Sequence, residues 1–215
     1  MLSWLQVDIA TLYDTYHARW SMLKVYLRSG KRKSRSLALL LPRYVALALG
    51  VTFCSQALAS QSNVAYFAGG CFWCTEAVFQ QAPGITSVVS GYMRNAETIQ
   101  ITFDSTKTSY DKLLNLFWRS HDPTQVDRQG PDIGKQYRSA IFYADEQQRQ
   151  AAEKSKAQLG KSGAYSKLIA TEITPAASFR PAPENHQNFC RRHPNNPYVR
   201  EVVVPKLEKL GLKRP

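Results

Sequence analysis

The stretch Val64-Ala65-Tyr66-Phe67-Ala68-Gly69-Gly70-Cys71-Phe72-Trp73-Cys74 places two thiols at a predicted strand-to-helix junction. Its apolar start is typical of a buried strand, the two glycines supply a tight turn, and residues 76–79 continue at helical spacing. Cys71 therefore lies at or next to a helix N-terminus, where unpaired N–H groups and the helix dipole stabilise a thiolate. We expect its thiol pKa to lie below the ordinary value of about 8.5, which favours a nucleophilic or redox role.

Three other interpretations of these cysteines are weighed against that one. A free cysteine often only packs in a core. A zinc site needs further ligands, and the chain has no second C-x-x-C and no H-x-x-x-H, so we expect no metal. A redox pair of the thioredoxin type also places C-x-x-C after a strand, and it remains the main rival. The remaining residues that could have served as zinc ligands are Cys54, Cys190, His17, His121, His186 and His193.

The motif resembles the catalytic signature of the peptide methionine sulfoxide reductase A family, in which Gly-Cys-Phe-Trp opens a helix and a Glu follows, as Glu76 does here. The resemblance covers about residues 64 to 207. It implies thiol-dependent reduction of methionine S-sulfoxide, in proteins and as the free amino acid, with no bound cofactor and a thioredoxin-like reductant. Further segments that match in order are Gly84 to Tyr92, Phe117-Trp118, His121 to Gln125, Asp127 to Gly130, and Asp132 to Ser139.

The resemblance also implies roles for single residues. Cys71 would attack the sulfoxide sulfur and become a sulfenic acid, and Glu97 would hydrogen-bond the sulfoxide oxygen. On residue type alone, Glu97 could instead be a surface carboxylate at the start of a strand. Four more side chains match family residues, two in the polar site and two in the aromatic wall around the substrate methyl group: Asp132 and Tyr137, and Phe72 and Trp73.

Reduction of an oxidised Cys71 needs a second thiol. Cys74 lies three residues along the chain and Cys190 lies in the tail, and either could form the disulfide. A relay through both would leave an exposed final disulfide for a thioredoxin-like partner to reduce. Cys190 could equally be an idle thiol, although an idle thiol is a liability in an oxidising compartment.

The chain departs from the family between Tyr92 and Glu97. The family usually carries a much longer loop there, including a tyrosine of the oxygen-binding site, and here only three residues separate Tyr92 from Ala96. Because Tyr92 belongs to the preceding strand, it is not assumed to replace that tyrosine. Pro183 also occupies a usual Glu position, and Glu184 lies one residue later. Two functions stay open: an active reductase with a shortened loop, or a relative that only binds Met-containing peptides or exchanges disulfides.

The hydrophobic patterns predict an α+β chain. Strands are expected over 64–68, 85–92, 97–103, 137–143 and 168–174, and helices over 71–82, 108–120 and 145–161. This β-α-β-β-α-β order with an added helix and strand predicts a ferredoxin-like two-layer α/β sandwich. From Pro175 onward we expect a long irregular C-terminal tail, with a short helix near Val204 to Leu210.

Residues 1–59 are a different kind of sequence. A basic cluster at Lys31 to Arg35, an apolar run from Tyr44 to Phe53 and the small-residue site Ala57-Leu58-Ala59 predict a signal peptide cleaved after Ala59. The run is too short to span a hydrocarbon core of about 30 Å, so we expect export, to a bacterial periplasm, without a stable membrane anchor. An uncleaved anchor is the alternative, and translation from Met22 would leave a leader of ordinary length.

Charge supports one domain without nucleic-acid binding. The chain has 28 Lys and Arg against 16 Asp and Glu, and residues 1–59 hold 8 and 2 of these, which leaves 20 and 14, or +6. The remaining cations are scattered among acids rather than grouped with aromatic residues, which argues against a nucleic-acid partner. Residues 60–215 have a length suited to one domain with a core of its own, and we expect a monomer.

Overall fold

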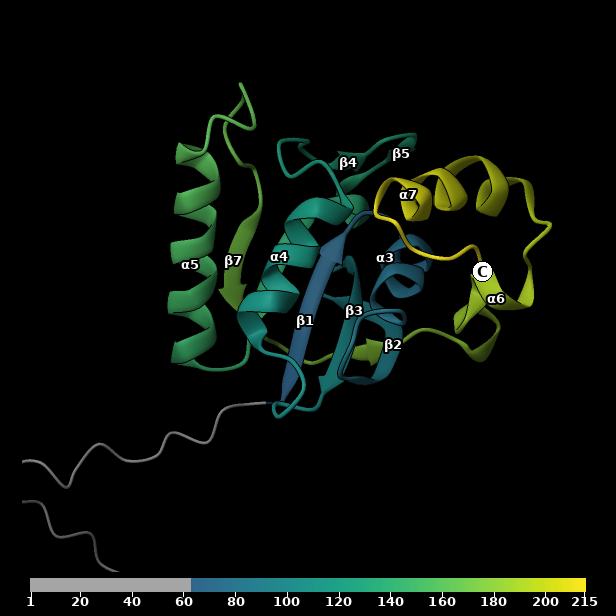
Figure 1. Ribbon diagram of the computed structural model, residues 1–215, viewed down its shortest axis with the longest axis horizontal. Coiled ribbons are helices and arrows are strands. Elements are labelled where there is room, and N and C mark those ends of the chain that lie inside the picture. The colour runs from purple at the N-terminus through teal and green to yellow at the C-terminus, as the bar shows by residue number, and fades with distance from the viewer. Residues whose placement is uncertain (1–62) are drawn as a thin grey trace, which may run out of the picture. The chain divides into compact units, whose positions relative to one another are not determined.

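A six-stranded mixed sheet organises residues 63–215, the part of the chain that this computed structural model describes (Figure 1). The strand order is β7-β6-β1-β3-β2-β8, and every neighbouring pair is antiparallel except β6 and β7. A separate two-stranded ribbon joins β4 to β5. The strands are β1 (Val64–Gly69), β2 (Ile85–Met93), β3 (Ala96–Phe103), β4 (Arg128–Gln129), β5 (Asp132–Ile133), β6 (Ser139–Tyr143), β7 (Glu172–Pro175) and β8 (Arg180–Pro181).

The helices begin where the sequence supplies caps. Ser109 accepts a hydrogen bond from the Lys112 N–H before α4, and Asp145 accepts one from the Gln148 N–H before α5. Shorter turns are the 3-10 turns Lys135–Tyr137 and Glu184–His186 and the π-turn Val199–Val203. The helices are α3 (Phe72–Phe79), α4 (Tyr110–Ser120), α5 (Glu146–Lys161), α6 (Phe189–Arg192) and α7 (Val204–Lys209).

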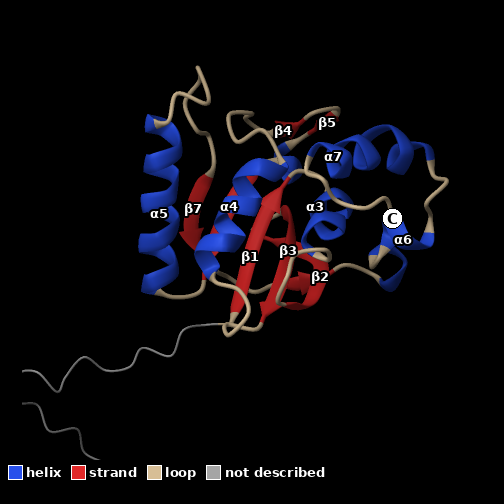
Figure 2. Cartoon of the chain, in the orientation of Figure 1, coloured by secondary structure: helices blue, strands red, loops and turns tan. Residues whose placement is uncertain are grey.

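The two faces of the sheet are covered differently. Helices α3 and α4 lie over one face, in front of β1 and β3, while α5 lies beside β7 (Figure 2). Phe67 and Ile101 point into this first core, where Phe117 stacks on Phe67. A smaller apolar cluster on the other face is closed by the chain before β8: Ala68, Met93, Ala96, Ala140 and Phe142, with Tyr66, Ala176 and Phe179 against them. Alternation along each strand therefore produces two cores on a single sheet.

A two-residue turn stands where the sequence lacks the longer loop. Arg94 and Asn95 have φ angles of 49° and 60°, and Met93 pairs directly with Ala96. Positive φ at both central residues is the mark of a type I′ hairpin turn, which fits the twist of the flanking strands. The short connection thus keeps β2 and β3 paired up to the turn.

The predicted elements compare closely with the observed ones. The α+β class and the order of strands and helices along the chain are confirmed. The helix predicted over 71–82 is shorter, because the chain turns after Phe79. The strand predicted over 137–143 begins only at Ser139, since residues 135–137 form a 3-10 turn, and the strand predicted over 168–174 begins at Glu172.

The predicted leader, its cleavage site and Cys54 lie outside the described residues, so they remain predictions. Within residues 63–215, no helix is both long and apolar enough to cross a bilayer.

Candidate active site

Cys71 occupies the N-cap position of α3, directly after the turn that ends β1. Gly70 has φ +92°, and a Cβ on it would lie 2.6 Å from the Cβ and Cγ of Gln129, so both the conformation and the space require glycine. The Cys71 side chain is 7% exposed. The predicted strand–turn–helix junction is therefore confirmed, with its first thiol at the helix start.

Cys71 and Cys74 form a hydrogen-bonded thiol pair, and Cys74 is the thiol whose pKa is lowered. The bond from Cys71 lowers the pKa of Cys74 to about 6 against the opposing effect of burial, with Lys206 adding a smaller favourable charge. The same bond and burial raise the pKa of Cys71 well above its ordinary range. The expectation of a lowered pKa at Cys71 is thus wrong for the reduced pair. Two adjacent thiols share one proton, and that proton stays on Cys71.

Glu97 is a carboxyl with a raised pKa beside the thiol pair. It lies near the start of β3 and accepts a hydrogen bond of 2.9 Å from the Phe72 N–H, at the first turn of α3. Burial raises its pKa to about 7, the Phe72 N–H opposes that shift, and the charges of Asp132 and Cys74 add to it. A carboxyl with this pKa is substantially protonated at neutral pH and can donate a proton.

Tyr198 contacts both the β4–β5 ribbon and the thiol pair, and the sequence analysis did not identify it. Its hydroxyl donates to Asp132 Oδ2 at 2.7 Å and lies 3.6 Å from Cys74 Sγ. Tyr198 stands far along the tail in a stretch rich in proline and asparagine, where no spacing or motif marks it. Only the fold brings it to the thiol pair, at the end of the tail segment before the π-turn.

Two more tyrosines lie around Glu97. Burial raises the pKa of Tyr137, with the negative charges of Glu97 and Cys71 adding to the shift. Burial likewise raises the pKa of Tyr92, where the charges of Glu97 and Cys71 add and Arg180 opposes. The structure therefore brings the predicted Cys71, Glu97, Asp132 and Tyr137 into one site, and it adds Tyr92 and Tyr198.

The predicted aromatic residues lie beside the thiols. Trp73 stacks on Phe189 with ring centroids 3.7 Å apart and planes 7° apart, and on His186 at 5.7 Å and 18°. Phe72 meets the Tyr92 ring edge-on at 5.5 Å. The indole N–H of Trp73 is buried without a hydrogen-bond partner in the described part of the chain. An aromatic wall of this kind suits an apolar group such as a thioether methyl.

Cys190 is a buried, unreactive thiol in this reduced state. It is 2% exposed and donates to the Trp73 carbonyl at 3.4 Å. Burial raises its pKa to about 12, and the charges of Cys74 and Glu76 contribute. All three cysteines of the described residues are free thiols, and all are buried. The predicted exposed disulfide at Cys190 concerns the oxidised protein and stays a prediction, since all three described cysteines are free thiols here.

Glu76 fastens the tail to α3. Its carboxyl is 1% exposed and accepts the Asn188 N–H at 3.0 Å. Burial raises its pKa, while the N–H groups of Asn188 and Phe189 oppose the shift. Gln187 also bonds both backbone groups of Ser90 in β2. These bonds hold Phe189 in its place over Trp73.

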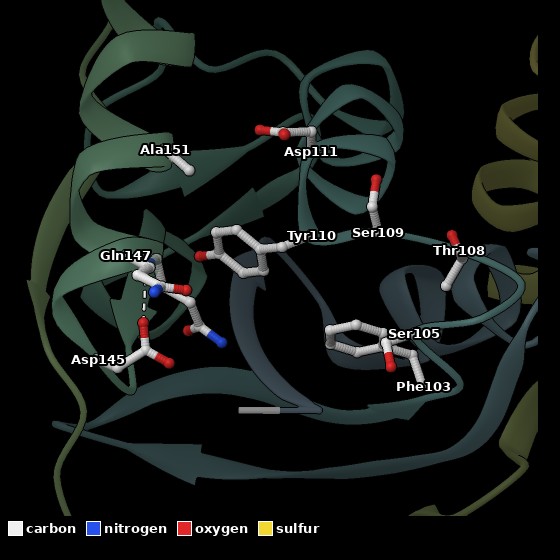
Figure 3. Close-up of a pocket in the computed structure, with 10 residues that line it drawn as sticks. Phe103, Ser105, Thr108, Ser109, Tyr110, Asp111, Asp145, Gln147 and Ala151 are labelled. Carbon is white, nitrogen blue, oxygen red and sulfur yellow. Dashed lines mark hydrogen bonds between the residues drawn. The ribbon is translucent and has the colours of Figure 1, made fainter. Parts of the chain in front are cut away.

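A separate pocket lies at the far end of the sheet from Cys71, around Tyr110, Asp145 and the end of β3 at Phe103 (Figure 3). The Tyr110 hydroxyl points toward the start of α5 and has no hydrogen-bond partner among residues 63–215. Its lining residues include hydroxyls and carboxylates but no cysteine, histidine, lysine or arginine. Within the same residues, no group of three or more potential metal ligands occurs.

Comparison with known proteins agrees with the thiol site. The family model described as Peptide methionine sulfoxide reductase matches residues 63–96 and 94–214. Its two spans meet at the Arg94–Asn95 turn, where the longer loop is missing. The peptide methionine sulfoxide reductase MsrA 1 of Rhodopirellula baltica is 44% identical over 166 residues, which cover 69% of this chain and 85% of that protein. The MsrA of Nautilia profundicola is 42% identical, covering 67% and 92%.

Solved structures show the same fold. Reduced Mxr1 of Saccharomyces cerevisiae superposes with a TM-score of 0.59 at 27% identity, covering 62% of this chain and 86% of that one. Methionine sulfoxide reductase A of Corynebacterium diphtheriae gives 0.55 at 29% identity, covering 65% and 80%. The chain belongs to the peptide methionine sulfoxide reductase family and is an oxidoreductase that reduces methionine sulfoxide through its thiols.

Proposed function

We propose that Cys71 is the thiol that reduces methionine S-sulfoxide, with Glu97 as the proton donor. The observation that carries this assignment is the Phe72 N–H bond to Glu97, which holds a carboxyl of pKa about 7 beside the thiol pair. Phe72 and Trp73 hold the substrate methyl group, and Asp132 and Tyr137 complete the polar side of the site. The substrate is methionine sulfoxide in proteins or as the free amino acid.

The chemical step moves one oxygen and two electrons. For attack, the Cys71 proton passes across the hydrogen bond to Cys74, and the Cys71 thiolate attacks the sulfoxide sulfur. Glu97 supplies a proton to the sulfoxide oxygen. The attack joins Cys71 Sγ to the substrate sulfur. The protonated oxygen then passes from the substrate sulfur to Cys71 Sγ, the sulfur–sulfur bond breaks, and methionine leaves as the thioether while Cys71 becomes a sulfenic acid. Methionine sulfoxide gains the two electrons that Cys71 loses.

Cys74 is the first resolving thiol in this proposal. It is next to Cys71, and its lowered pKa favours loss of the proton that it took from Cys71. The Cys74 thiolate then attacks the sulfenic sulfur, which forms the disulfide and releases hydroxide that leaves as water once protonated. Cys190 is the second resolving thiol, and its burial means that the tail must move before it takes part. A thioredoxin-like donor then returns the disulfide to two thiols, and no bound cofactor is required.

A shortened-loop relative that only binds peptides or exchanges disulfides is not favoured. Such a protein would need no proton donor, yet Glu97 remains hydrogen-bonded beside the thiols with its pKa near neutrality. The match also covers 85% and 92% of two relatives that are named as reductases.

The architecture we propose is a ferredoxin-like two-layer sandwich. The order β6-β1-β3-β2 and the placement of α3 and α4 on one face support it, with β7 and β8 added at the edges. The chain after Pro175, in which helices are short, supports the irregular C-terminal tail.

We also propose a signal peptide cleaved after Ala59, export to a periplasm, and a monomer that repairs exported proteins without a membrane anchor or nucleic-acid partner. These rest on the sequence of residues 1–59 and on the scattered charge of the remainder. N-terminal sequencing of protein from its native host should find Ser60 first. An intact Met1 or Met22 on a cytoplasmic protein would overturn the export proposal.

The decisive experiment is turnover of both methionine sulfoxide epimers with dithiothreitol as reductant. We expect the S epimer alone to be reduced and Cys71→Ser to lose at least about 10³-fold in rate, because a hydroxyl is neither ionised nor nucleophilic toward sulfur. Full activity in Cys71→Ser would refute the assignment.

Thiol counting after one equivalent of substrate tests the resolving step. The unaltered protein should lose two thiols, whereas a variant lacking both Cys74 and Cys190 should lose one and retain a sulfenic acid. Loss of only one thiol in the unaltered protein would exclude both cysteines as partners of Cys71.

A further inference from the structure

A row of three side chains crosses neighbouring strands beside the thiol pair. Tyr92 of β2 pairs directly with Glu97 of β3 on one side and with Arg180 of β8 on the other. Directly opposite residues of antiparallel strands project from the same face of a sheet. Glu97 projects toward α3, because it bonds the Phe72 N–H, so Tyr92 and Arg180 also lie on the face that carries the thiols.

Three neighbours fix the Tyr92 ring. The Arg180 guanidinium lies 4.6 Å from its centroid, and Phe72 meets it edge-on at 5.5 Å and 62°. The Arg94–Asn95 turn follows almost at once and locks the Tyr92–Glu97 register. The turn begins two residues after Tyr92, and both strands are still paired where the ring projects.

The Tyr92 hydroxyl is available to a ligand. The side chain is half-buried, and within the described residues its hydroxyl has no hydrogen-bond partner. Burial, and after it the charge of Glu97, raises its pKa, so the hydroxyl keeps its proton at neutral pH and remains a donor. The ring stands between the proposed proton donor and the aromatic wall.

We propose that Tyr92 is a catalytic residue that donates a hydrogen bond to the sulfoxide oxygen alongside Glu97, with Arg180 as a residue that positions its ring. This inference rests on the proposed function. It assigns to a strand residue the oxygen contact that the missing loop cannot supply.

The chemistry needs such a second donor. The sulfoxide oxygen carries partial negative charge, and that charge grows as the thiolate attacks and the sulfur–oxygen bond weakens. One donor, Glu97, gives up its proton during this step. A neutral hydroxyl that stays protonated continues to stabilise the oxygen throughout, so its effect is greater in the transition state than in the bound substrate.

The test compares Tyr92→Phe with Tyr66→Phe. Tyr66 is the matched control, since it lies on the opposite face and its hydroxyl accepts a hydrogen bond from Gln100, its one such partner among residues 63–215. With S-sulfoxide substrate we expect Tyr92→Phe to lower kcat by about 10- to 100-fold with little change in KM, as for loss of one hydrogen bond to a charged group. Tyr66→Phe should stay within about twofold of the unaltered protein.

A second readout separates an oxygen contact from mere packing on Phe72. The aromatic disulfide 5,5′-dithiobis(2-nitrobenzoate) reacts with the thiol pair at its disulfide bond and has no sulfoxide oxygen. Tyr92→Phe should therefore react with it at the normal rate. Arg180→Met keeps an aliphatic stem over the ring and should lower kcat by a smaller factor, about threefold to tenfold.

Unchanged kcat in Tyr92→Phe, or equal losses in sulfoxide and disulfide reactions, would overturn the proposal. A different result, an unaltered protein without any sulfoxide turnover, would overturn the proposed function on which it rests.

Discussion

Helix α3 contains one buried glutamate, Glu76, and accepts a second, half-buried one, Glu97, at its first turn, and the two differ in their surroundings. Glu97 receives the N–H of Phe72 at the start of the helix, and Glu76 inside the helix receives N–H groups from the tail at Asn188. Burial raises the pKa of both. What differs is the surroundings: Glu97 faces two thiols and two tyrosines, whereas Glu76 faces backbone donors that it satisfies. Burial alone therefore does not mark a catalytic acid.

The same Glu→Gln substitution should lower activity strongly at position 97 and only slightly at position 76. Glu97→Gln removes the proton donor, and we expect kcat for S-sulfoxide reduction to fall by about 10²- to 10³-fold, because general acid catalysis contributes on this scale. Steady-state turnover measures it. Glu76→Gln, assayed at a temperature where it is folded, should stay within about threefold. Equal losses in the two variants would show that both glutamates act only through structure.

The pH dependence of kcat/KM sharpens the role of Glu97. Attack needs a deprotonated thiol of the pair, which forms above the pKa of about 6, and a protonated Glu97, which is lost above its pKa of about 7. The rate should therefore rise about tenfold per pH unit below 6 and fall about tenfold per unit above 7. In Glu97→Gln the alkaline fall should vanish while the acid limb remains. If the fall in kcat/KM at alkaline pH persists in the variant, that fall belongs to a group other than Glu97.

Glu76→Gln should show its effect in stability. The amide keeps one acceptor oxygen but loses the charge that strengthens the bonds to the Asn188 and Phe189 N–H groups. We expect the free energy of unfolding to fall by about 1–2 kcal/mol, measured by urea denaturation at pH 7. Cys190 alkylation should also speed up, because the tail opens more often. An unchanged midpoint would mean that the tail is held by Gln187 and the aromatic stack instead.

Substitution of Glu97 should change stability in the opposite direction, and only at alkaline pH. Its pKa is about 7 in the folded protein against about 4.3 in an unfolded chain, so the folded state binds more protons between these values. Stability therefore falls as pH rises from about 4 to 7. Glu97→Gln removes this cost, and we expect it to be about 1–2 kcal/mol more stable than the unaltered protein at pH 8, after allowance for partial exposure, with little difference at pH 4. Parallel urea titrations at both pH values check it.

The features predicted correctly from the sequence are those that depend on residues close together along the chain. The strand, the Gly69-Gly70 turn and the helix start at Cys71 follow from local pattern, and the family motifs located Glu97 and Tyr137. The proton on Cys71 could not be predicted that way, because it depends on a hydrogen bond whose geometry only the folded helix start fixes. Tyr198 was missed because its contact with Asp132 joins segments 66 residues apart.

Tyr92 shows a different limit. As a sequence position it belongs to a strand, which by itself does not predict an active-site role. The register with Glu97 does indicate one, since cross-strand pairing is what brings the two side chains together. Whether a strand residue faces a site depends on its partner across the ladder, which a single sequence does not specify.

The Arg94–Asn95 turn has a consequence for how this fold can vary. Because β2 and β3 stay paired up to it, an insertion there leaves the sheet register unchanged, and each doubling of loop length costs only about 0.6 kcal/mol of closure entropy. The turn lies two residues beyond Tyr92, at the margin of the site. Peptides of different length and charge could therefore be grafted at this position to select among oxidised polypeptides by size or sign of charge, with the thiol chemistry left in place.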